Sequence, residues 1–154
     1  MVTRIGLLLM AGLALSHPVQ SQHAAQPLFG LEQFNPAAGK WTEDPDAPHT
    51  WSQLVRGDPA HGRWIMYVKI DPGAWINWHW HSNPQSMFGV SGTMEYEIKP
   101  APKFTFGPGS FAVIPSHALH NGQCISKEPC YFFIENLLPN DKHMTDETGA
   151  PLKK

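Results

Sequence analysis

The sequence has few charged residues, and it has no apolar run long enough to cross a membrane as a stable helix. Only 16% of its 154 residues are charged, and the formal net charge is −2. This balance provides no basic field for nucleic acid and no polybasic patch for anionic lipid. The longest apolar run, Ile5–Leu15, is about half the length of a transmembrane helix. We therefore expect neither a nucleic-acid partner nor an integral membrane protein.

Several motifs are also missing from the sequence. It contains no glycine-rich phosphate loop, no dinucleotide-binding fingerprint and no Ser-His-Asp signature. We therefore expect no organic cofactor. Internal repeats and helical heptads are absent as well, and the length suits one domain.

The apolar run lies where a secretory signal peptide would place it. Arg4 precedes Ile5–Leu15, and polar residues follow from Ser16. This order of charge, apolar stretch and polar residues is typical of a signal peptide. Small residues favour cleavage after Ser21, with cleavage after Ser16 as the alternative. We expect a signal peptide over residues 1–21 and a secreted or periplasmic protein.

Cysteine is scarce too, and both cysteines lie close together. Cys124 and Cys130 flank a five-residue segment. In an oxidising compartment such a pair favours a disulfide. Two free thiols are the alternative, whereas metal binding by both is disfavoured because the spacing is not that of a zinc site.

The sequence is instead rich in proline and glycine, with 15 and 13 residues, between short apolar stretches. This pattern predicts β-strands joined by turns. The expected strands are 64–70, 74–81, 86–90, 93–99, 104–106, 110–114 and 130–135. Their short, regular spacing predicts an antiparallel β-sandwich or barrel.

The expected barrel occupies residues 61–138. Residues 22–60 are rich in Pro, Gly, Asn and Asp without a clear period, so we expect an arm with at most one short strand. Residues 139–154 are polar and are expected to form a loose tail.

Histidine supplies the expected functional site. His79 and His81 lie two residues apart on one expected strand and therefore share a face, which we expect to point into the barrel. Gln85 starts the next strand, and His120 lies on a later hairpin. Three imidazoles and one side-chain oxygen form a known coordination set that leaves positions open for water or substrate.

These residues and the glycines and proline around them resemble the two conserved motifs of the cupin superfamily. The matching positions are Gly73, His79, His81, Gln85, Gly92, Gly109, Pro115 and His120. The sequence departs from the family at Gln85, His117 and Cys124, where Glu, Gly and often Asn are usual. The resemblance covers about Trp64 to Glu135 and implies an all-β jelly-roll barrel of six to eight strands, one divalent metal ion and often a homodimer.

The glutamine at position 85 makes the expected metal site electrically neutral. A glutamate would bring one negative charge, whereas Gln85 leaves the metal with its full charge and is expected to raise its redox potential. We expect copper or iron, with manganese, nickel or zinc as alternatives. Gln85 could instead hydrogen-bond a metal-bound water without ligating.

Two further residues are candidates for a role in catalysis. His117 precedes His120 in a turn and could donate a proton near the open metal position, or it could be an exposed turn residue. Trp75 has the strand parity of His79 and is expected to line the cavity, whereas Trp78 and Trp80 are expected to face away.

An oxidoreductase is the function that the sequence favours. The expected site resembles that of quercetin-type dioxygenases, and a small secreted cupin rich in tryptophan also resembles copper-dependent cupins that oxidise cellulose. We expect activation of dioxygen or peroxide against an aromatic or carbohydrate substrate. Non-redox isomerase or lyase catalysis and a non-catalytic metal or ligand carrier are the alternatives.

Overall fold

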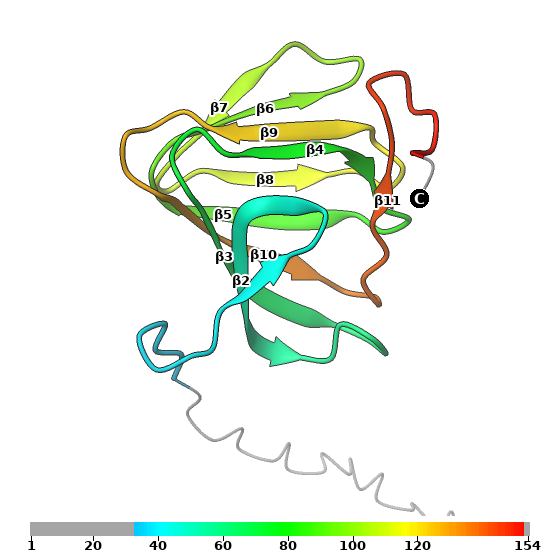
Figure 1. The fold of residues 1–154 in the computed structure, drawn as a ribbon. Coiled ribbons are helices and arrows are strands. Elements are labelled where there is room, and N and C mark those ends of the chain that lie inside the picture. Colours follow the sequence, from blue (N-terminus) through cyan, green and yellow to red (C-terminus); the bar gives the residue numbers. More distant parts are fainter. Residues whose placement is uncertain (1–32, 153–154) are drawn as a thin grey trace, which may run out of the picture. The chain divides into compact units, whose positions relative to one another are not determined.

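The structure is a computed structural model that describes residues 33–152, so the expected signal peptide lies outside the described residues (Figure 1). The described residues form eleven β-strands. Their bounds are β1 Thr42–Asp44, β2 Ala47–Gly57, β3 Trp64–Ile70, β4 Trp75–Trp80, β5 Gln85–Ser91, β6 Met94–Ile98, β7 Phe104–Phe106, β8 Phe111–Ile114, β9 His120–Cys124, β10 Cys130–Asn136 and β11 His143–Met144. Within residues 33–152, no helix has the length and apolar character needed to cross a membrane.

The strands form two antiparallel sheets that Figure 1 shows as facing layers. The first sheet has the order β1-β2-β3-β10-β5-β8, and the second has the order β11-β4-β9-β6-β7. Strands that are distant in sequence therefore pair, such as β3 with β10 and β4 with β9. The all-β jelly-roll class predicted from the sequence is confirmed.

The core lies between the sheets and follows from strand alternation. In β6, Met94 and Tyr96 are buried, whereas Glu95 between them is only partly covered. Phe132 in β10 is 1% exposed and faces them from the other sheet. Each such fully buried apolar side chain stabilises the fold by about 1.5–3 kcal/mol.

The motif glycines mark turns that a side chain would strain. Gly73, Gly92 and Gly109 have φ angles of 78°, 70° and 77°, in the left-handed region that favours glycine. At Gly92 a Cβ atom would also lie 2.7 Å from the Cα of Cys130. The motif spacing therefore reports backbone geometry as well as metal ligands.

The predicted disulfide between Cys124 and Cys130 is present. Cys124 ends β9 in one sheet, and Cys130 begins β10 in the other. The bond therefore links the two sheets at the opposite end of β9 from His120.

The segment before residue 61 contributes more strand than the sequence predicted. Instead of an arm with at most one short strand, it contains β1 and the eleven-residue β2, which pairs with β3. Polar Thr50 and Gln53 are buried in β2, so no apolar alternation reveals the strand. Upstream of β1, the ring of Phe34 packs edge-on against Tyr67 of β3 at a centroid distance of 5.5 Å.

The expected loose tail over residues 139–154 is also wrong in part. Its residues His143 and Met144 form β11, which pairs with β4 opposite Trp80 and His79. Two residues make too short a strand to leave a periodic signal in the sequence. The barrel therefore extends beyond both ends of the expected range 61–138.

Candidate metal centre

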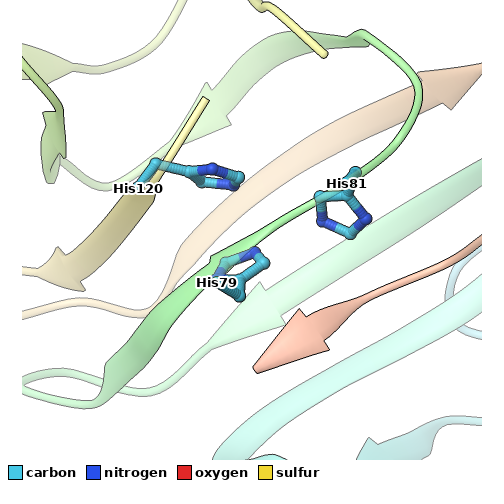
Figure 2. Close-up of side chains that lie close together, drawn as sticks. All are labelled: His79, His81 and His120. Atoms are coloured by element: carbon cyan, nitrogen blue, oxygen red, sulfur yellow. The ribbon is translucent and has the colours of Figure 1, made fainter. Parts of the chain in front are cut away.

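Backbone pairing brings the three histidines together. His79 of β4 lies directly opposite His120 of β9 in the strand register, and His81 follows just after the end of β4. One potential ligand atom from each ring lies within 4.8 Å of the other two. Figure 2 shows the three rings pointing toward one another. Among residues 33–152, no other group of three or more histidine, cysteine or acidic side chains lies close enough together to hold one ion.

Hydrogen bonds fix the orientation and protonation of each ring. The Nδ1 atoms of His79, His81 and His120 lie 2.7 Å from the main-chain oxygens of Asn77, Asp141 and Ala118, respectively. A carbonyl oxygen only accepts, so each Nδ1 carries the donated proton. Each Nε2 then has a free lone pair for a metal ion.

Burial keeps the three imidazoles neutral. The side chains are at most 5% exposed. Desolvation, assisted by the neighbouring His120, lowers the pKa of His79 to about 2 and that of His81 to about 4. Desolvation also lowers the pKa of His120. Neutral imidazole is the form that binds metal, so no proton must leave these rings before an ion binds at neutral pH.

This donor set fits one transition-metal ion. Neutral imidazole suits zinc, copper, iron and nickel. Metal-ligating histidines almost always donate their second N–H to a carboxylate, a carbonyl or water, and all three rings already do so. His79, His81 and His120 would hold the ion.

Gln85 reaches the site from the opposite sheet. It begins β5, is 4% exposed, and lines the same cavity as the three histidines. Its side-chain oxygen would complete the neutral donor set expected from the sequence. Ligation by Gln85 stays a prediction.

The histidines open onto a cavity of about 470 Å³ between the sheets. Apolar side chains form much of its wall, namely Met66, Val68, Ile76, Met87, Ile114, Phe132 and Ile134. The β1–β2 hairpin contributes the acidic residues Glu43, Asp44 and Asp46. The ammonium of Lys142, also a lining residue, lies 2.5 Å from the Asp44 carboxylate and 3.8 Å from that of Asp46. The volume and the mixed lining suit a small organic molecule.

The expectation that Trp75 lines this cavity is wrong. A β-bulge lies in β4 between Ile76 and His79, where β4 holds one more residue than β9. The extra residue reverses the alternation, so Ile76 lines the cavity and Trp75 is 44% exposed. A residue on the outer surface cannot touch a substrate bound at the histidines.

His117 lies outside the cavity as well. Its exposed ring stacks on Trp80 at a centroid distance of 5.1 Å. Its φ angle of 60° lies in the region that favours glycine, which is the residue that the family resemblance expects there. Its backbone N–H donates to the His81 carbonyl over 2.7 Å, so its contribution to the site is through the main chain. The structure therefore gives the ring no place for the expected proton donation.

Asp141 is the functional residue that the sequence did not reveal. Its carbonyl orients His81, and its carboxylate accepts a hydrogen bond from the Ser82 N–H over 3.1 Å. The main-chain contact depends on the fold and leaves no side-chain signal in the sequence.

Comparison with known proteins supports the reading of the two motifs. The family model described as "Cupin domain" matches residues 66–134. No curated protein matches the chain.

Solved structures share the fold at low sequence identity. The polyketide cyclase RemF from Streptomyces resistomycificus aligns with a TM-score of 0.61 and 17% identity, over 70% of this chain and 79% of its own. An RmlC-like cupin from Shewanella frigidimarina aligns with a TM-score of 0.60 and 14% identity, over 70% of this chain and 91% of its own.

A third structure, of the DMSP lyases RdDddP and RnDddQII, aligns with a TM-score of 0.60 and 18% identity, over 70% of this chain and 63% of that chain. These similarities concern the fold, and the family model adds the sequence pattern over residues 66–134. Residues 66–134 of the chain are a cupin domain.

Proposed function

We propose that this protein is a mononuclear metal-dependent oxidoreductase that acts on a small organic molecule. The observation that carries the proposal is the set of three Nδ1–carbonyl hydrogen bonds at His79, His81 and His120. They leave three Nε2 lone pairs beside a cavity large enough for a substrate. Side chains oriented before an ion arrives lower the cost of binding it.

The neutral donor set favours redox chemistry. No acidic side chain within residues 33–152 joins the histidine group, and Gln85 lines the cavity where the family resemblance expects glutamate. When bound, a copper or iron ion with neutral ligands would keep its full positive charge and supply an accessible redox step. The protein would hold the substrate against the apolar wall and exclude water from the histidines.

Lewis-acid catalysis is the second candidate. RemF is described as a cyclase and another structure with this fold as DMSP lyases. A metal in an open site can also polarise a substrate oxygen without a redox step. The same histidines and cavity would serve this reaction.

We further propose that the protein acts outside the cytoplasm. The Cys124–Cys130 disulfide supports this location, because such bonds persist in oxidising compartments. The expected signal peptide would deliver the chain there. Mass spectrometry of the exported protein would identify the cleavage site.

Oxygen uptake distinguishes the two reaction types. Protein loaded separately with copper, iron or zinc would be incubated with quercetin and with cellohexaose as aromatic and carbohydrate probes. Oxygen consumption with copper or iron, absent with zinc and in His79→Ala, supports an oxidoreductase. Conversion with zinc and without oxygen uptake supports Lewis-acid catalysis, and metal binding with no conversion of either probe argues for a carrier. His61→Ala removes an exposed histidine that does not line the cavity and serves as the matched control.

A further inference from the structure

The cavity wall contains a buried hydrogen-bond donor that the metal site does not use. Trp64, at the start of β3, lines the cavity and is 2% exposed. Its indole Nε1 is buried and makes no hydrogen bond to any of residues 33–152. An indole N–H can only donate, so a buried one normally has an acceptor. Leaving such a group unpaired costs about as much as a lost hydrogen bond.

Trp64 lies on the same cross-strand row as Gln85. Trp64 pairs with Asn136 of β10, and Asn136 pairs with Gln85 of β5. All three side chains are at most 4% exposed, on the inner side of the sheet. Neighbouring strands are about 4.8 Å apart, so the Trp64 and Gln85 backbones are about 10 Å apart. That separation matches the length of a small organic molecule.

The residue between them, Asn136, also has an unpaired donor, but it is not among the residues that line the cavity. The Asn136 Nδ2 is buried and also lacks a partner within the described part of the chain. Its Oδ1 accepts from the Leu138 N–H over 3.4 Å, which leaves the amide nitrogen free to donate. Trp64 is therefore the unpaired donor of this row that lines the cavity, and Gln85 lines the same cavity with the histidines.

Charge at the cavity indicates which acceptor would bind. Glu43, Asp44 and Asp46 line the cavity, and the lining cation Lys142 already pairs with Asp44 and Asp46. In the metal-free cavity these groups sum to a negative charge, which disfavours an anion there. The apolar wall likewise favours an uncharged molecule.

We propose that Trp64 is a specificity-determining residue that donates its indole N–H to an uncharged oxygen acceptor, such as a carbonyl or ether, on a substrate with an apolar body. The acceptor lies at the Trp64 end of the row, and the reacting end of the substrate lies at the histidines. The position of the reacting end rests on the proposed function, whereas the hydrogen bond at Trp64 does not.

Nuclear magnetic resonance of the ¹⁵N-labelled full chain tests this directly. The probes are acetophenone, which has a neutral acceptor, ethylbenzene, which lacks it, and benzoate, which is anionic. Trp64→Phe keeps an aromatic ring, removes the donor and assigns the Trp64 indole signal. Trp75→Phe is the control, because Trp75 is exposed and does not line the cavity.

Acetophenone is expected to shift the Trp64 indole signal saturably, and ethylbenzene and benzoate are not. Wild-type protein is expected to bind acetophenone about two- to tenfold tighter than Trp64→Phe does, while ethylbenzene binds both equally. Trp75→Phe is expected to bind like the wild type. A Trp64 signal that no probe moves, or equal acetophenone affinity in wild type and Trp64→Phe, would overturn the proposal.

A zinc titration of the same samples separates this inference from the proposed function. Zinc shifts at the histidine rings without any probe response at Trp64 would overturn the inference alone. A Trp64 response to acetophenone in a protein that binds no zinc would support the inference and refute the proposed metal site.

Discussion

His81 donates its Nδ1–H to the main-chain carbonyl of Asp141, 2.7 Å away and sixty residues further along the chain. The other two histidines bond to carbonyls only two residues away in sequence, at Asn77 and Ala118. The orientation of His81 therefore depends on the C-terminal segment, which pairs with β4 through β11.

Removing that segment is expected to weaken metal binding. A chain that ends at Asn140 lacks the acceptor for His81, and loss of such a partner lowers metal affinity by about 10- to 100-fold. A chain that ends at Met144 keeps Asp141 and β11 and serves as the control, with affinity close to that of the full chain. Competitive titration with a chromogenic chelator gives the affinities, and circular dichroism checks the fold. Equal affinity in both truncated chains would show that the hydrogen bond does not matter for binding.

Substitutions at Gln85 are expected to change metal affinity in opposite directions. Gln85→Ala removes the oxygen donor and is expected to weaken binding of Cu²⁺ by about tenfold, whereas Gln85→Glu adds a negative charge and is expected to strengthen it by at least about tenfold. Electron paramagnetic resonance of the Cu²⁺ form reports on the ligand set. An unchanged spectrum and affinity in Gln85→Ala would show that Gln85 is not a ligand.

The metal-free protein is expected to lose stability as the pH falls below about 6.5. The pKa of His81 is about 4 in the folded chain against 6.5 for an unperturbed imidazole, so the unfolded chain binds more protons in this interval. The contribution of His81 to the free energy of unfolding is fully present above pH 6.5 and is lost as the pH falls toward 4. The loss is about 3 kcal/mol for His81 alone.

Urea unfolding at pH 7 and pH 4.5 measures this loss. His81→Asn lacks the titrating ring and is expected to lose less stability over the same interval. If its loss equals that of the wild type, protonation of His81 does not contribute to acid unfolding.

The disulfide is expected to stabilise the barrel without affecting the metal site. Replacing Cys124 and Cys130 together by alanine removes the link between the sheets and is expected to lower the free energy of unfolding by about 2 kcal/mol in the chain-entropy model. Metal affinity is expected to stay the same, because Cys124 ends β9 and His120 begins it. A large loss of metal affinity with the fold intact would contradict this separation.

The sequence predicted the central barrel because its strands alternate or carry strong apolar runs. The stretch from Trp64 to Ile70 and that from Phe104 to Phe106 were predicted with the bounds that the structure has. Strand β2 was missed because its buried positions include the polar residues Thr50 and Gln53.

The candidate metal site was predicted in part, because strand parity holds only where pairing is regular. His79 and His81 lie on either side of Trp80, beyond the β4 bulge, and His120 lies opposite His79. Trp75 lies before that bulge, so its side chain points to the opposite face from the one that strand alternation predicts, and it is exposed. Asp141 acts through its carbonyl, which every residue has, so no residue type could reveal it.

Metal stoichiometry tests the central claim most directly. Wild-type protein would be incubated with an excess of Cu²⁺ or Zn²⁺, dialysed and analysed by inductively coupled plasma mass spectrometry, beside His79→Ala/His120→Ala and the control His61→Ala, an exposed histidine outside the cavity. We expect one tightly bound ion per chain in the wild type and in the control, and less than about a tenth of that in the double variant. Equal metal content in the double variant and the wild type would contradict a site formed by His79, His81 and His120.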